Sequence, residues 1–90
     1  MSLNPQEANQ FKKDMRRVMS QGKAFEKIMA VLVALVNQEP LDQKYRDHPL
    51  GNNWKGCREL HIEPDWLLIY KIEDKNLWLL RTGSHSDLFG

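Results

Sequence analysis

The sequence predicts an α+β fold in which an N-terminal helical hairpin packs on an antiparallel sheet of three to four strands, followed by a short C-terminal helical turn. Two observations predict it. Apolar residues recur every three or four positions before residue 37, as on one face of a helix. From residue 55 to residue 83, short apolar runs alternate with polar turns, as in strands joined by hairpins. At 90 residues the chain accommodates a single domain, spanning residues 1–90.

Composition and charge are those of an ordinary globular protein. With 41% hydrophobic and 28% charged residues, disorder is not indicated, and a net charge of +1 does not by itself indicate a nucleic-acid-binding protein. Cys57 is the one cysteine, so an intrachain disulfide and a zinc site built on several thiolates are both excluded. The longest apolar run, residues 28–36, is roughly half the length of a membrane span. We therefore expect a cytoplasmic protein with neither membrane anchor nor signal peptide.

The first helix is predicted to begin at Asn4 and to end near Gly22. The segment Asn4–Glu7 supplies a favourable N-cap, a proline at the first helical position and a glutamate three residues after the cap. The apolar residues fall on one face, and four cations fall largely on another: Lys12, Lys13, Arg16 and Arg17. Such a cationic face is either solvated or in contact with phosphates, and the residues alone favour the solvated alternative.

The second helix is predicted over residues 25–36, where apolar residues surround most of the cylinder. We expect it to be mostly buried and to pack antiparallel on the first helix through the short connection at residues 21–23. Pro40 is incompatible with a helix interior, which places the end of this helix near Asn37.

A long loop and an antiparallel meander follow. Residues 39–56 have no periodicity and are rich in proline, glycine and asparagine, which predicts a loop of unusual length containing His48. Strands are predicted at about residues 55–62, 66–72 and 77–83. Ser84 is placed to cap a final turn that ends at Phe89.

Five polar residues are candidates for chemistry at one end of this sheet: His48, His61, Asp65, Arg81 and His85. Histidine titrates near neutral pH, so two such groups supply a general base and a general acid, and an arginine stabilises charge on a phosphate. That combination suits metal-free RNA cleavage, in which the 2′-hydroxyl attacks the adjacent phosphorus and the 5′-oxygen departs.

Three alternatives remain open for these residues. They are isolated surface histidines, a metal site of three histidines or of two histidines and a carboxylate, and an Arg81 paired with a structural carboxylate. From spacing alone, the absence of any chemistry is favoured. The metal site is the weakest alternative, because no histidine pair has close helical ligand spacing and no short metal motif is present.

Several blocks of the chain closely resemble the YafQ-like branch of the RelE/ParE superfamily of bacterial type II toxins. The resemblance runs from Phe11 onward and rests on residues 45–50, 54–56, 58–59, 61–71 and 80–89. It implies the RelE-like fold and a ribosome-dependent mRNA interferase, which enters the ribosomal A site, cleaves the message there and is silenced by a cognate antitoxin. The implied partners are the antitoxin, the ribosome with its RNA, and mRNA. No cofactor, metal or membrane is implied, and the location is the bacterial cytoplasm.

The resemblance also implies roles for particular residues. The acid–base group is His48, His61, Asp65 and His85. We favour His48 or His61 as the base and His85 as the acid, with Asp65 orienting a histidine or sharing the base role.

Arg81 is the cation expected to stabilise the phosphate, and Trp66 and Phe89 are supporting or base-contacting aromatic residues. The cationic helix face becomes an expected contact with ribosomal RNA. The family fold also begins with an edge strand, whereas residues 3–9 here have no alternating pattern. A second hypothesis is a catalytically silent binding module that acts through its antitoxin complex in transcriptional autoregulation.

Overall fold

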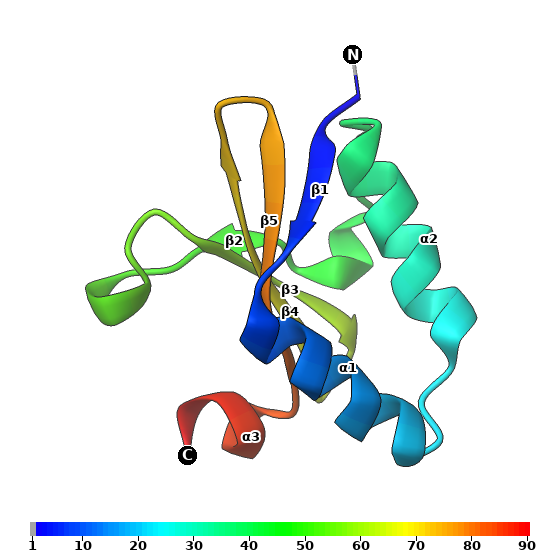
Figure 1. The fold of residues 1–90 in the computed structure, drawn as a ribbon. Coiled ribbons are helices and arrows are strands. Elements are labelled where there is room, and N and C mark those ends of the chain that lie inside the picture. The colour runs from blue at the N-terminus through cyan, green and yellow to red at the C-terminus, as the bar shows by residue number, and fades with distance from the viewer. Residues whose placement is uncertain (1) are drawn as a thin grey trace.

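The computed structural model describes residues 2–90, which form a five-stranded sheet with two long helices on one face and a short helix on the other. The chain runs β1 (Asn4–Glu7), α1 (Asn9–Ser20), α2 (Phe25–Val36), β2 (His48–Pro49), β3 (Arg58–Glu63), β4 (Trp66–Glu73), β5 (Asn76–Gly83) and α3 (His85–Phe89). Two short 3₁₀ turns, Gln43–Tyr45 and Asn52–Trp54, flank β2. The chain reverses direction between α1 and α2 (Figure 1). The predicted α+β class, the helical hairpin and the short C-terminal helix are confirmed.

The sheet is mixed rather than wholly antiparallel. Over residues 2–90 its strand order is β1-β5-β4-β3-β2, with β1 parallel to β5 and every other neighbouring pair antiparallel. The meander of β3, β4 and β5 was predicted within a few residues. The sheet nevertheless has five strands instead of three to four, because the residues themselves gave no strand signal for β1, which only the family resemblance implied, or for the two-residue β2.

The first strand corrects the predicted start of the first helix. Asn4–Glu7 is an edge strand, and α1 begins only at Asn9. The backbone N–H of Asn4 donates to the carbonyl oxygen of Lys75 at 2.9 Å, and the N–H of Ala8 donates to that of Leu79 at 3.0 Å. Proline at an edge position costs the sheet little, because its missing N–H faces away from the neighbouring strand. Pairing with β5 therefore outweighs the local signature of a helix start.

Helix α2 has the predicted bounds but not the predicted burial. Ile28, Val31 and Leu35 are buried against the sheet. Phe25 and Val33 on the outer side keep 52% and 49% of their surface exposed. The prediction of a mostly buried helix is wrong, because only one side of the cylinder rests on the sheet.

Two apolar clusters fill the two faces of the sheet. The larger one joins both long helices to the sheet and includes Phe11, Val18, Trp66 and Leu77. On the opposite face, a smaller cluster joins Leu67 and Ile69 of β4 to Leu88 of α3. The turn bearing α3 is therefore anchored to the sheet. Within residues 2–90, no helix is both long and apolar enough to cross a membrane.

Candidate active site

Three histidines from separate segments form a row, with His61 of β3 in the middle and His48 and His85 as its two neighbours. The ring centroids of His48 and His61 are 6.2 Å apart, and those of His61 and His85 are 5.8 Å apart. His48 comes from β2, His61 from β3 and His85 from the first turn of α3. The unexpected strand β2 makes this possible, because pairing with β3 places His48 directly opposite Glu59.

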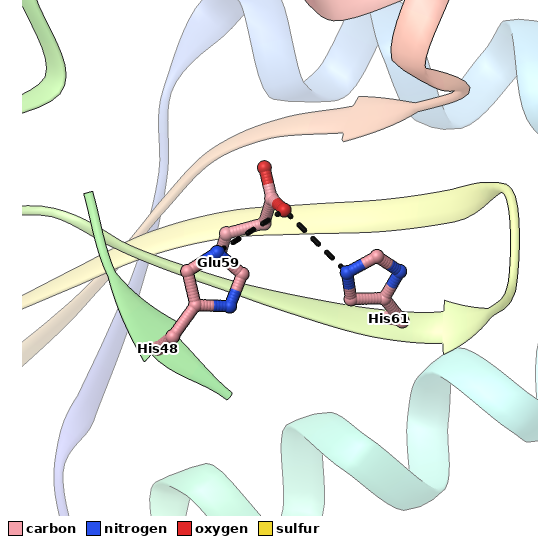
Figure 2. Close-up of side chains that lie close together, drawn as sticks. All are labelled: His48, Glu59 and His61. Carbon is pink, nitrogen blue, oxygen red and sulfur yellow. Dashed lines mark ion pairs between the residues drawn. The ribbon is translucent and has the colours of Figure 1, made fainter. Parts of the chain in front are cut away.

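Glu59 lies between two of these histidines and was missed from sequence. Its side chain is only 6% exposed, and its Oε1 atom lies 3.5 Å from Nε2 of His48 and 3.6 Å from Nε2 of His61. Figure 2 shows the carboxylate between the two rings. Residues two apart on a strand point to the same face, so the spacing of Glu59 and His61 was a usable signal.

Backbone carbonyls fix the proton positions of these two rings. Nδ1 of His48 lies 2.6 Å from the carbonyl oxygen of Arg46, and Nδ1 of His61 lies 3.3 Å from that of Pro64. A carbonyl oxygen only accepts hydrogen bonds, so each Nδ1 carries a proton. In the neutral ring, Nε2 then holds the lone pair and faces Glu59. Both rings thus present a basic Nε2 atom beside the carboxylate of Glu59.

The third histidine is held by the carboxylate of Asp65 in the turn between β3 and β4. Oδ1 of Asp65 accepts from the backbone N–H of His85 at 2.9 Å and from its ring Nδ1 at 2.8 Å. These two bonds, the backbone one first, lower the pKa of Asp65 below its ordinary value. The geometry therefore joins the turn at Asp65 to His85, as expected for an orienting carboxylate.

Helix α3 presents His85 from a well-fixed start. The Ser84 hydroxyl accepts from the backbone N–H of Asp87 at 3.1 Å, and the Asp87 carboxylate accepts from the backbone N–H of Ser84 at 3.0 Å. This reciprocal capping box confirms the predicted role of Ser84. It also lowers the pKa of Asp87, chiefly through the Ser84 backbone N–H.

Arg81 is bound to a buried carboxylate that sequence reasoning did not single out. Asp14 of α1 is wholly buried, and it accepts from Nε of Arg81 at 2.7 Å and from the backbone N–H of Thr82 at 3.1 Å. One alternative left open from sequence, an Arg81 paired with a structural carboxylate, therefore describes its contacts here. The signal was present, since Asp14 lies three residues after Phe11 and four before Val18 on the apolar face of the helix.

Opposing effects set the charge state of Asp14. Burial acts most strongly and raises its pKa, but hydrogen bonds from Arg81, Gln10, the Thr82 backbone and Arg17 together outweigh it. The net result is a pKa below the ordinary value, so the carboxylate stays ionised at neutral pH.

The cations of α1 do not form one uniform face. Lys12, Lys13 and Arg16 are exposed. Arg17 instead turns toward the sheet, where Nη1 lies 2.9 Å from Oδ1 of Asp14 and Nη2 donates to the carbonyl oxygen of Thr82 at 2.8 Å. Lys12, Lys13 and Arg16 are thus the three of these cations with exposed side chains, whereas the guanidinium of Arg17 is engaged in contacts within the chain.

The two aromatic candidates differ sharply in exposure. Trp66 is wholly buried, and its indole N–H donates to the Thr82 hydroxyl at 2.9 Å. It has no surface to offer an RNA base, so of its two expected roles only the supporting one fits this conformation. Phe89 remains 47% exposed at the end of α3 and is able to stack on a base.

The chain matches known proteins over nearly its whole length. The model of the family described as "Bacterial toxin of type II toxin-antitoxin system, YafQ" matches residues 3–90. The curated mRNA interferase toxin YafQ of Escherichia coli strain B / BL21-DE3 is 45% identical over 84 residues, covering 92% of this chain and 91% of that protein. A chain in the crystal structure of the E. coli DinJ-YafQ toxin-antitoxin complex is 41% identical, with a TM-score of 0.91 and 100% of both chains covered. A metal-bound toxin from Helicobacter pylori is 38% identical with a TM-score of 0.91, covering 97% of this chain and 99% of that one.

Proposed function

The chain belongs to the YafQ family of bacterial type II toxins, and on that basis we propose that it is a ribosome-dependent endoribonuclease that cleaves mRNA in the A site. Its curated relative is an mRNA interferase, and its E. coli relative forms a complex with the antitoxin DinJ. The proposed activity needs no metal, and a cognate antitoxin holds the toxin inactive. The observation that carries the proposal is the row of three histidines from three different segments.

The base is proposed to be His48 or His61. Nδ1 of each ring carries a proton and donates it to a backbone carbonyl oxygen, so Nε2 of the neutral ring is the atom that accepts the 2′-hydroxyl proton. The freed oxygen attacks the adjacent phosphorus, and the bond to the 5′-oxygen breaks. Glu59, within 3.6 Å of either Nε2, stabilises whichever imidazolium forms.

His85 is the proposed acid, with Asp65 as its orienting group. The ring gives its Nε2 proton to the departing 5′-oxygen, while Nδ1 keeps its own proton and donates it in a hydrogen bond to Oδ1 of Asp65, 2.8 Å away. A ring held in this way keeps its orientation in both protonation states. This arrangement supports the acid role because the ring centroid of His85 lies 5.8 Å from that of His61, so a base and an acid are available at the same place.

The remaining groups bind and stabilise the RNA in this proposal. Arg81 stabilises charge on the phosphate from its anchored position on Asp14, and Phe89 stacks on a base near the cleavage point. Trp66 supports the site from the core. The exposed cations Lys12, Lys13 and Arg16 contact ribosomal RNA.

The test is cleavage of a translated message by the purified chain with active ribosomes, read out by primer extension, with and without a chelator. Because a relative binds a metal, the chelator arm is essential. The chelator is one that binds transition metals and leaves the Mg²⁺ required by the ribosome in place. Cleavage that is unchanged by it is expected, and cleavage lost with it would contradict the metal-free mechanism. A chain that binds its antitoxin but never cleaves would instead support the silent binding module.

A further inference from the structure

The carboxylate of Asp47 binds two side chains of the neighbouring strands, one position before His48. The Tyr70 hydroxyl donates to it, with Oη 2.8 Å from both Oδ1 and Oδ2, and Nε of Arg58 donates to Oδ1 at 3.1 Å. We propose that these three residues, the Asp47 anchor, position His48 for RNA cleavage and fix its tautomer. The role in cleavage rests on the proposed function, whereas the positioning of the ring does not.

The Asp47 anchor and the His48 ring lie on opposite faces of the sheet. Side chains that follow one another along an extended chain point to opposite faces. His48 faces Glu59 on the side of the histidine row, whereas Asp47 reaches Tyr70, which belongs to the apolar cluster under the two long helices. Tyr70 is only 2% exposed. The anchor is therefore placed to affect the reaction through His48 and not by direct contact with RNA.

Strand β2 is too short to hold His48 by itself. It has two residues, whereas strands usually have about three to ten. A cavity of about 570 Å³ lies beside the loop, and Asp47, Arg58 and Tyr70 are among the residues that line it. Packing on that side of the loop is therefore incomplete, so the hydrogen bonds of the anchor have to fix the segment.

The residue before Asp47 has an unfavourable backbone conformation that bears directly on His48. Arg46 is left-handed, with φ 50° and ψ 41°. Such a conformation is costly for a residue with a side chain and persists where surrounding contacts enforce it. The Arg46 carbonyl oxygen accepts from Nδ1 of His48 at 2.6 Å. Asp47 lies between the two residues in the chain, so holding Asp47 fixes both partners of the bond that sets the tautomer.

The donors of the anchor keep their protons at neutral pH. Burial, and then the hydrogen bond to Asp47, raises the pKa of Tyr70, so its hydroxyl remains a donor. Arg58 is always a cation, and its bond to the carboxylate is charge-assisted. The register of β3 and β4 places Arg58 directly opposite Tyr70. Two neighbouring strands therefore present both donors to one carboxylate.

The first experiment observes the His48 ring without RNA. Long-range ¹H–¹⁵N spectra, recorded at a pH where the rings are neutral, distinguish a ring protonated at Nδ1 from one that exchanges between tautomers. In the unmodified chain His48 should be protonated at Nδ1, because a carbonyl oxygen only accepts. Tyr70→Phe and Asp47→Ala should each convert His48 to an average of both tautomers. His61 should be unchanged in the same spectra and is the internal control.

The second experiment measures translation-coupled cleavage by primer extension over a range of ribosome concentrations. Asp47→Ala should lower the maximal rate by about 10² and Tyr70→Phe by about 10-fold, because displacing a reacting group by about 1 Å costs up to roughly 10²-fold. The ribosome concentration that gives half the maximal rate should stay the same, since the anchor lies away from the histidine row. Asp47→Asn still accepts from the Tyr70 hydroxyl and should keep more of the rate than Asp47→Ala.

A double-mutant cycle with His48→Ala tests whether the anchor acts through His48. In the His48→Ala chain, Tyr70→Phe should lower the rate by less than about 2-fold, because the ring that it positions is already absent. Tyr45→Phe is the matched control, since Tyr45 belongs to the 3₁₀ turn just before Asp47 and its hydroxyl lies outside the anchor. It should leave the His48 spectrum and the rate unchanged.

The outcomes that would overturn the proposal differ between the two experiments. An unchanged His48 tautomer in both anchor variants would overturn the positioning of the ring. Additive losses in the double-mutant cycle, or an unchanged rate in His48→Ala, would overturn the role of the anchor in cleavage. If the unmodified chain never cleaves, the proposed function fails, and the ring spectra still decide whether the anchor positions His48.

Discussion

Arg81 donates from Nε to Oδ2 of Asp14 at 2.7 Å, joining two residues that are 67 positions apart in the chain. The pair ties α1 to the last strand just before that strand leads into the short helix carrying His85. Arg17 adds a second link, because it bonds both Asp14 and the carbonyl oxygen of Thr82. The first helix is therefore fixed to the segment that presents the proposed acid.

Asp14→Asn should lower the free energy of unfolding by about 2–4 kcal/mol at neutral pH. The substitution removes the buried charge that satisfies Arg81 and Arg17, and breaking such a pair from one side is more costly than an exposed pair is worth. Urea denaturation followed by circular dichroism measures this change. Glu73→Gln is the control, since Glu73 is 57% exposed, pairs with Lys71 at 3.5 Å and should change stability by less than about 0.5 kcal/mol.

The same carboxylate predicts how stability depends on acid pH. The pKa of Asp14 is lower in the folded state than its ordinary value of 3.8. Its contribution is therefore complete above that value and is lost as the pH falls through 3.8 toward the folded pKa. Between roughly pH 5 and pH 3, the unfolding free energy of the unmodified chain should fall more steeply than that of Asp14→Asn. Parallel curves would show that Asp14 is not a linked group.

His85→Ala should reduce the rate of translation-coupled mRNA cleavage by about 10² or more while the fold is kept, because general acid catalysis typically contributes that much. Asp65→Asn should cause a smaller loss of about 10-fold, since the ring remains but loses its carboxylate partner. Primer extension on a translated message measures both rates. Ser86→Ala, at the next position of α3 and exposed, is the matched control, and a rate unchanged by His85→Ala would remove that residue from the mechanism.

Comparing the variants Arg81→Ala and Asp14→Asn distinguishes a catalytic role of Arg81 from a structural one. If Arg81 stabilises the phosphate, Arg81→Ala should lower cleavage by about 10² or more, the typical loss on removing one charge-stabilising group. Asp14→Asn, which leaves the guanidinium in place, should retain cleavage within about 10-fold at a temperature where the variant is folded. Equal losses in both variants would assign the ion pair a structural role alone.

The exposed cations of α1 should control binding to ribosomes. Replacing Lys12, Lys13 and Arg16 with glutamine should weaken ribosome binding and reduce the slope of log affinity against log salt by about one per lost phosphate contact. Co-sedimentation with ribosomes across a salt series measures this slope. Arg17→Gln should instead lower the unfolding free energy, because its contacts are with Asp14 and Thr82. An unchanged salt slope in the triple variant would favour a merely solvated face.

Sequence predicted best those parts of the fold that local pattern determines. The apolar runs of β4 and β5 and the bounds of α2 depend on neighbours a few positions away, so periodicity found them. Strand β1 depends on β5, near the other end of the chain, and its local residues favour a helix start. Two-residue β2 has too little sequence for any periodicity, and it exists because β3 offers it a free edge.

The residues of the candidate site also divide into those that the sequence identified and those that only the structure showed. The histidines were identifiable because imidazole is rare and chemically distinctive, and family resemblance added their roles. Glu59 and Asp14 were missed because charged residues are usually exposed, and only the packing of β3 and α1 shows that these two are buried. Arg17 turns inward because it pairs with the buried Asp14. Helix periodicity could not predict this orientation, since it did not predict that Asp14 is buried.

The parallel pairing of β1 with β5 has a consequence for how the chain folds during its synthesis. Among residues 2–90, β1 has β5 as its only neighbour in the sheet, although it is the first strand to be synthesised and β5 is the last. A growing chain on the ribosome cannot complete this sheet until β5 has emerged, and His85 follows β5. The three histidines proposed to cut mRNA therefore come together only once β5 and the residues after it have been synthesised and have folded onto the sheet.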